Sequence, residues 1–356
     1  MSTMPQPEVR VTVGVDTHAD SHVGVALDQL GRDLGTITVE TTLRGYGQLL
    51  SWASGFGVVD RFGIEGTGCW GAGLARWLHT QGLVVIEVDR PNRRARRRYG
   101  KSDPADARAA ARAVQSGEAT GTPKAGNGAV EAIRTLQVPY RTAVKARSQA
   151  ANQLHALVVT APEPLRGRLH DLRLRELVEV AARLRPGPEL DTPLEATKQA
   201  LRLLARRYRQ LDAEAVELTR QLHTLVVAVA PALLAEQGVG THTAATLLVT
   251  AGDNPERLHS ESSFAHLCGV APLDASSGKQ QRHRLNRGGD RQANSAIHTI
   301  AIVRMSHDPT TRAYVARRIA EGKTKRETVR CLKRYIARRI YHHLTDITYQ
   351  PALDTT

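Results

Sequence analysis

The sequence predicts an α/β N-terminal domain with a mixed sheet, followed by a mainly α-helical part with a coiled-coil-like hairpin and a helical C-terminal domain. Two observations predict this class. The first hundred residues alternate short β-branched runs with helical segments, whereas the middle of the chain repeats apolar residues at steps of four and three. The 356 residues are enough for two domains with complete cores.

Strands are predicted in the first hundred residues, where β-branched side chains recur at alternate positions. Three consecutive antiparallel strands are expected first, and two later strands alternate with helices. Helices between strands act as crossover connections, so the sheet should be mixed and covered on both faces. The expected strands cover residues 9–16, 22–28, 35–42, 61–65 and 83–89, with helices over 46–53 and 69–81.

Acidic residues stand at the carboxyl ends of two predicted strands and at the start of the next helix. Asp16 closes the first strand and Glu65 the fourth, and Asp103 and Asp106 share one face of a helix predicted to start at Pro104, with Asp103 as its N-cap. Ligands bind at this edge of open α/β sheets. Neighbouring carboxylates repel unless a cation lies between them. Taken singly, each is an ordinary strand-end or first-turn residue; together they predict the divalent-metal site of an RNase H-like nuclease core.

Lysine and arginine give the chain a net charge of +14, which predicts a partner with many negative charges. Nucleic acid is the first candidate, because basic side chains neutralise phosphates whatever the base sequence. One basic cluster directly precedes Asp103 and Asp106 in the sequence and is expected to bind backbone phosphates. The ordinary alternative is a solvent-exposed helix face. Its residues are Arg93, Arg94, Arg96, Arg97, Arg98 and Lys101.

Neither a membrane protein nor a zinc or disulfide protein is predicted. The longest apolar run, residues 225–235, is too short to span a bilayer and contains a proline. The three cysteines are far apart and form no paired motif. No histidine is predicted to ligate a metal, and His18 and His22 flank a predicted turn. The N-terminus lacks a targeting pattern, so a cytoplasmic protein is expected.

Long helices are predicted in the middle and at the end of the chain. After a linker at residues 121–128, helix is expected over 129–160, and a break follows at 185–188. Residues 314–344 are expected to form a basic helical tail with an apolar stripe. The helix after the break carries an apolar seam that fits either a coiled coil between chains or a hairpin within one; we favour a hairpin that also dimerises. The seam comprises Leu204, Tyr208, Leu211, Ala215, Leu218, Leu222 and Leu225.

The C-terminal region carries two short motifs. Gly238 and Gly240 precede a helix predicted over 243–249 and resemble the turn of a helix-hairpin-helix unit, where backbone N–H groups meet a phosphate, although glycines also simply end helices. Ser276 and Ser277 precede a glycine, and such a hydroxyl becomes a nucleophile when a base or metal activates it; the alternative is a flexible loop. Basic residues expected to bind nucleic acid surround the serines: Lys279, Arg282, Arg284 and Arg287.

Taken together, these motifs resemble the DEDD transposases of the insertion sequence 110 family, which include the Piv-type DNA invertases. The shared motifs are G-V-D-T-H at 14–18, G-I-E-G-T-G at 63–68, G-K-S-D-P-A-D-A at 100–107, G-V-G-T-H-T-A-A at 238–245, and the block from G-V-A-P to R-G-G-D. The resemblance implies a RuvC-like, RNase H-like catalytic domain over 1–120, a helical dimerisation region over 121–235 and a C-terminal transposase domain over 236–356.

The resemblance also implies how the protein would act. It assigns Mg²⁺ binding to Asp16, Glu65, Asp103 and Asp106, and a covalent link to DNA to a serine best matched by Ser277, with its neighbour Ser276 as rival. Carboxylates from one subunit and serine from another would form a composite site in a dimer or tetramer. Donor and target DNA are the implied partners, together with the bridge non-coding RNA that guides many members; fixed-site inversion without RNA remains open.

The expected function is therefore that of a transposase or site-specific DNA recombinase of a mobile element. Two alternatives remain open. A RuvC-like structure-specific nuclease would use metal-activated water in place of serine, and a non-catalytic nucleic-acid-binding protein would use the acids only as caps. A sugar-kinase or actin-like ATPase is disfavoured, because G-V-D-T-H has no second glycine-rich phosphate loop to match it.

Overall fold

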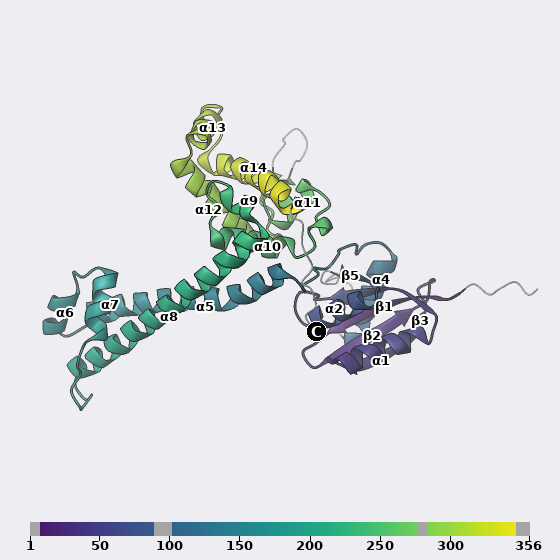
Figure 1. Cartoon of the computed structure of the whole chain (residues 1–356), viewed down its shortest axis with the longest axis horizontal. Helices are drawn as coiled ribbons and strands as arrows, with labels where there is room; N and C mark the ends of the chain where they lie inside the picture. The colour runs from purple at the N-terminus through teal and green to yellow at the C-terminus, as the bar shows by residue number, and fades with distance from the viewer. Residues whose placement is uncertain (1–7, 89–101, 276–282, 347–356) are drawn as a thin grey trace, which may run out of the picture. The chain divides into compact units, whose positions relative to one another are not determined.

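The computed structural model describes residues 8–88, 102–275 and 283–346, and these form two compact units (Figure 1). Of the described residues, unit 1 comprises 8–88 and 102–128 together with an inserted segment, Ala251–His259. Unit 2 comprises Ala129–Thr250, 260–275 and 283–346. The three-domain division expected from the sequence remains a prediction. No helix among the described residues is long and apolar enough to cross a bilayer.

Unit 1 is built on the expected mixed sheet of five strands. In chain order these are β1 (Arg10–Thr17), β2 (Ser21–Leu27), β3 (Asp33–Glu40), β4 (Val58–Glu65) and β5 (Val84–Val88). Their order across the sheet is β3-β2-β1-β4-β5. The first three strands are antiparallel neighbours, and β4 and β5 add parallel to β1. The prediction of an RNase H-like mixed sheet is confirmed.

Helices cover both faces of this sheet because side chains alternate along β1. Helices α1 (Leu43–Ser54) and α2 (Ala72–Thr80) pack on the face that carries Val11, Val13 and Val15. The opposite face receives α4 (Asp103–Gln115). At Gly14 an added Cβ would lie 1.9 Å from the Ala107 carbonyl oxygen, so only glycine allows α4 to approach this closely. The close approach brings the first turn of α4 to the sheet.

Gly14→Ala is expected to lower the free energy of unfolding of unit 1 by about 3 kcal/mol or more, which is the upper end of the range for an overpacked core. The cost is large because the new methyl group would clash with backbone atoms of α4, which cannot rotate away as a side chain can. Chemical denaturation of the full chain measures this. Gly47→Ala in α1 is the matched control: its Cβ would meet nothing within 4 Å, so that variant should be neutral or slightly more stable. Equal stability of the two variants would contradict the close packing of α4.

The start of α4 differs from the prediction by one residue. Ser102, in an extended conformation, is the N-cap, and Asp103 is already the first helical residue, with Pro104 second. The predicted N-cap role of Asp103 is therefore wrong. This difference favours a metal site. An N-cap carboxylate accepts hydrogen bonds from the helix amides, whereas Asp103 lies within the first turn together with Asp106.

Unit 2 begins with the expected helical hairpin. Helices α5 (Ala129–Val159) and α8 (Pro193–Val229) run side by side (Figure 1), and Arg147 on α5 pairs with Asp212 on α8 at 2.5 Å. The hairpin tip is closed by α6 (Glu163–Leu169) and α7 (Leu174–Ala182) around a buried apolar cluster. Every residue of the predicted seam on α8 is buried or half-buried, as a hairpin requires. Dimerisation through this hairpin remains a prediction.

Among its described residues, the rest of unit 2 is mainly helical and includes one short pair of antiparallel strands. A short α9 (Pro231–Ala235) precedes α10 (Thr241–Ala251), and residues 255–257 form a 3₁₀ turn within the segment that belongs to unit 1. Then follow α11 (Glu261–Leu267), β6 (Leu273–Asp274), β7 (His283–Arg284) and α12 (Arg291–His307). The predicted helical tail is present as two helices, α13 (Pro309–Ala320) and α14 (Lys325–Thr345), and Gly322 takes a φ of +88° between them.

Candidate functional site

The carboxyl ends of β1 and β4 lie next to each other and carry two of the predicted acids. Asp16 is the penultimate residue of β1 and Glu65 the last residue of β4. The parallel register pairs Val15 with Ile64, and the Thr17 hydroxyl donates to the Glu65 carbonyl at 2.9 Å. Both side chains are half-buried. The sheet therefore places Asp16 and Glu65 at one edge, as strand-end positions predict.

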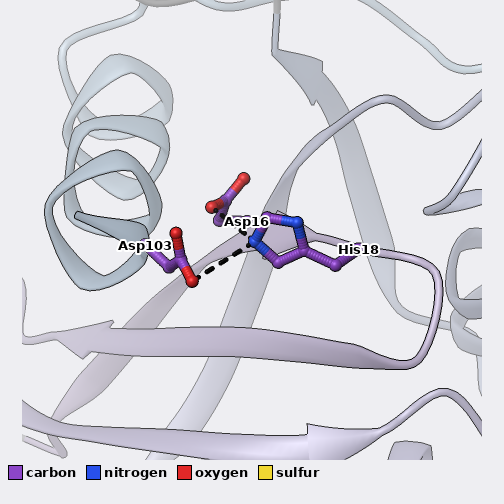
Figure 2. Close-up of side chains that lie close together, drawn as sticks. All are labelled: Asp16, His18 and Asp103. Carbon is purple, nitrogen blue, oxygen red and sulfur yellow. Dashed lines mark ion pairs between the residues drawn. The ribbon is translucent and has the colours of Figure 1, made fainter. Parts of the chain in front are cut away.

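The first turn of α4 contributes the other two acids, and a histidine joins Asp103 to the sheet edge. His18 Nε2 lies 3.3 Å from an Asp16 carboxylate oxygen and 3.4 Å from an Asp103 carboxylate oxygen (Figure 2). One donor atom from each of the three residues lies within 4.8 Å of the others. Asp106 is 5% exposed. This arrangement is a cluster of three candidate ligands, defined by Asp16, His18 and Asp103.

Electrostatics within the cluster favour a bound cation. Burial raises the pKa of Asp16, the charge of His18 lowers it, and the charges of Asp106 and Asp103 raise it further. Asp106 therefore acts on Asp16 even though it is not one of the three clustered ligands. A divalent ion would favour the ionised form of every carboxylate here, and oxygen with imidazole nitrogen is a donor set that such ions accept. The residues present fit a divalent metal.

The sequence offered no convincing metal-ligand partner for His18, whereas the structure places His18 with two carboxylates in a candidate group of ligands. The alternation of a strand holds the missing signal: residues 16 and 18 stand two apart at the end of β1 and therefore share a face. His18 Nε2 is shielded from solvent, yet it makes no hydrogen bond of acceptable geometry with the described residues. Its closeness to the two carboxylates is thus electrostatic.

Glu65 reaches the same edge by strand register, but its carboxylate is not among the three clustered ligands. The turn after it is tight, with Gly66 at a φ of +74°. Thr67 in that turn is buried and donates its hydroxyl to Glu87 Oε1 at 2.7 Å. The turn that follows Glu65 is therefore tied to the end of β5.

Residues 251–259, from the second half of the sequence, contact the end of β5 as well. Arg257, whose side chain is 13% exposed, places Nη2 3.9 Å from Glu87 Oε2 and donates from Nε to the Thr122 carbonyl at 3.0 Å. Asn254 donates to the Pro123 carbonyl at 3.0 Å. The predicted linker at 121–128 is thus packed against this segment within unit 1. A chain of contacts leads from Arg257 through Glu87 to the turn after Glu65.

The remaining predicted binding residues fall into two groups. Gly238 takes a φ of +82° against α12, Gly240 is exposed immediately before α10, and Arg284 and Arg287 are exposed. These four residues belong to unit 2, whereas the acidic cluster belongs to unit 1. Outside the described residues lie Arg93, Arg94, Arg96, Arg97, Arg98, Lys101, Ser276, Ser277, Lys279 and Arg282.

The two ends of the predicted serine loop are held together. Pairing of β6 with β7 joins residues 273–274 to 283–284. Just outside this pair, Gly289 lies so close to Gly269 that an added Cβ would be 2.3 Å from the Gly269 nitrogen. Asn294 donates to the carbonyls of Cys268 and Gly269 at 3.1 and 2.8 Å, and accepts from Lys333 Nζ at 2.5 Å. The described residues on either side of 276–282 are therefore tied to each other.

A further network supports the turn that carries Gly238. Buried Glu236 accepts from Arg304 at 2.8 Å and from Arg339 at 2.6 Å, and its Oε1 lies 2.7 Å from His343 Nε2. Arg304 also donates from Nε to the Gln237 carbonyl at 2.7 Å. Two arginines and a histidine thus surround one buried carboxylate, and the backbone before Gly238 is held against α12 and α14.

Comparison with known proteins agrees with this geometry. Residues 13–161 match a family model for transposases of the DEDD IS110 type, and residues 230–316 match a model described as the transposase IS116/IS110/IS902 family. A relative from Streptomyces coelicolor, described as an insertion element IS110 uncharacterized 43.6 kDa protein, is 29% identical over 220 residues. That match covers 62% of this chain and 53% of the relative, about half of its length.

Proposed function

Because the chain belongs to the IS110 family of insertion-element transposases, we propose that it cuts and rejoins DNA as a divalent-metal-dependent site-specific recombinase. The observation that supports this most directly is the approach of Asp103, from α4, to Asp16 and His18 at the edge of an RNase H-like sheet. Membership of the DEDD family implies a bound divalent metal ion. Asp16, His18 and Asp103 at this edge are side chains that could coordinate such an ion.

The metal would be held by Asp16, Asp103 and Asp106 with Glu65, and His18 would supply a nitrogen ligand. When bound, the ion supplies positive charge to the phosphate that is cut. The rigid packing of α4 on Gly14 keeps Asp103 and Asp106 in place, and the Thr67 contact holds the turn after Glu65.

Ser277 is the proposed nucleophile, in keeping with the family resemblance. Its Oγ forms an ester with phosphorus, the bond from phosphorus to the leaving deoxyribose oxygen breaks, and the serine proton ends on that oxygen. The phosphoester bond is conserved, so attack by a different deoxyribose hydroxyl reverses the step and rejoins strands without an external energy source. A homo-oligomer and a bridge RNA that pairs with donor and target DNA complete the proposal.

A recombination assay tests this function. Full-length protein is mixed with DNA that carries the sequences flanking its gene, with and without Mg²⁺ and with and without a transcript of those flanks. Metal-dependent joined products with a covalent protein–DNA adduct are expected, and dependence on the transcript would indicate RNA guidance. Cleavage without an adduct would select the nuclease alternative. Binding without any metal-dependent change would select the non-catalytic one.

His18→Ala is expected to weaken Mn²⁺ binding roughly ten- to a hundred-fold, a loss known even for outer partners of metal ligands. Pulsed electron paramagnetic resonance should detect ¹⁴N coupling to bound Mn²⁺ in the native chain and none in the variant. His155→Ala, an exposed histidine on α5, is the control and should change neither quantity. Unchanged affinity and coupling in His18→Ala would show that His18 only accompanies the acids without binding the metal.

A further inference from the structure

A polar cleft of about 330 Å³ lies within unit 2, apart from the acidic cluster. Helices α5, α10 and α12 line it, and among the described lining residues there is one arginine and no carboxylate. The other polar side chains are a histidine, hydroxyls and an amide. The residues that matter here are Arg141, His242, Thr246, Gln292, Ser295 and Thr299. The hydroxyls of Thr246 and Thr299 already donate to the carbonyls of His242 and Ser295. Arg141, the Gln292 amide and the Ser295 hydroxyl therefore remain as donors, and one positive charge among them suits an anion better than an apolar or cationic ligand.

Arg141 is the one arginine among the described lining residues of this cleft, and it has no ion-pair partner among the described residues. Its Nη2 donates to Gln137 Oε1 at 2.8 Å and to Thr246 Oγ1 at 3.4 Å, which leaves most of its five N–H groups available. Asp290 acts on it electrostatically, but Asp290 Oδ1 already accepts from the backbone amides of Gln292 and Ala293, and its Oδ2 accepts from the Thr250 hydroxyl. Burial lowers the pKa of Arg141, so a bound anion would stabilise its charged form.

The start of α10 supplies a second, independent feature of an anion site. His242, in its first turn, stacks on Tyr140 with ring centroids 3.9 Å apart, and its Nε2 lies 3.2 Å from the Thr219 hydroxyl. The other ring nitrogen, Nδ1, is buried and has no hydrogen-bond partner within the part of the chain that the structure describes. The positive end of an eleven-residue helix adds to the potential of Arg141.

We propose that this cleft binds a single phosphodiester of a nucleic-acid backbone, with Arg141 as the charged contact and the Gln292 amide and the Ser295 hydroxyl as neutral donors. The proposal rests on the proposed recombinase function and extends it to α5 and α12. One cation among neutral donors matches the single charge of one phosphodiester, whereas an acidic peptide or a phosphomonoester would call for more positive charge. The phosphodiester can belong to DNA or to RNA.

Arg141→Gln in the full chain tests the proposal. Dissociation constants are measured against salt concentration for two probes, the duplex DNA that flanks the gene and the transcript of those flanks. For the probe that occupies the cleft, affinity should fall several-fold whatever the base sequence. The slope of log K against log[salt] should shrink by about 0.9 for duplex or about 0.7 for single-stranded nucleic acid.

Arg134→Gln is the matched control, because Arg134 lies on the same helix but already pairs with Glu131 at 2.7 Å. Its salt slope should equal that of the native chain. Ser295→Ala removes a hydroxyl donor of the exposed lining without removing charge, so affinity should fall while the slope is retained. If Arg141→Gln lowers the unfolding temperature, Arg141→Lys keeps the charge; it should restore the slope with only part of the affinity.

The outcomes separate this proposal from the recombinase function itself. Suppose that the native chain binds both probes and that Arg141→Gln shows the same salt slope as the native chain for each. That result would overturn the proposed phosphodiester site and leave the proposed recombinase function unaffected. Failure of the native chain to bind either probe would overturn both. A change for DNA alone or for the transcript alone identifies the source of the phosphodiester, and a change for both shows a site that accepts either backbone.

Discussion

Asp16→Asn is expected to abolish recombination at every Mg²⁺ concentration, a loss of roughly a thousand-fold or more in rate. The substitution removes a carboxylate that lies 3.3 Å from His18 and stands beside Glu65 at the sheet edge. The joined product is quantified across a Mg²⁺ titration, and Mn²⁺ affinity is measured in parallel. Residual recombination that rises with added metal would show that Asp16 assists binding without being required.

A fold defect can be distinguished from this loss. Asp60→Asn is the control, since Asp60 lies near the opposite end of β4 and pairs with Arg61 and Arg10. That variant should retain both activity and Mn²⁺ affinity. Asp16→Asn itself should not lower the free energy of unfolding of the metal-free protein, because burial and the charges of Asp106 and Asp103 already raise the pKa of Asp16. Loss of activity together with an unfolded chain would remove the support for a metal role.

Ser277→Ala is expected to abolish covalent protein–DNA adducts and recombination while leaving DNA affinity within about two-fold, because a methyl group cannot attack phosphorus. Labelled DNA that migrates with the protein on a denaturing gel measures the adduct. Ser276→Ala is the matched neighbour and should retain adducts. Since β6 and β7 hold the ends of the segment together, neither change should unfold the C-terminal helices.

The reverse pattern would identify the other serine. If adducts vanish in Ser276→Ala and persist in Ser277→Ala, the neighbour is the nucleophile and the recombinase function stands. If both variants cut DNA at the native rate without any adduct, metal-activated water is the nucleophile, and the RuvC-like nuclease alternative replaces the proposal.

The sequence by itself determined the layout of the first unit. Alternation of β-branched residues predicts the antiparallel strands, and helices between later strands predict parallel pairing, because both are local patterns of side-chain direction. Strand ends place Asp16 and Glu65 at one edge for the same reason. The seam from Leu204 to Leu225 likewise predicts the hairpin of α5 and α8, since period alone identifies the face that must be covered.

Only the tertiary structure decided which side chains that are distant in the sequence lie close together. His18 lies close to Asp103 because α4 packs directly on Gly14. Arg257 lies close to Glu87 because residues 251–259 pack within unit 1. Arg141 lines a cleft with residues of α12 because α5 packs near α12 in unit 2. None of these contacts follows from spacing along the chain. Spacing specifies the direction of a side chain within its own element, whereas the partner is set by how elements pack, which depends on the whole core.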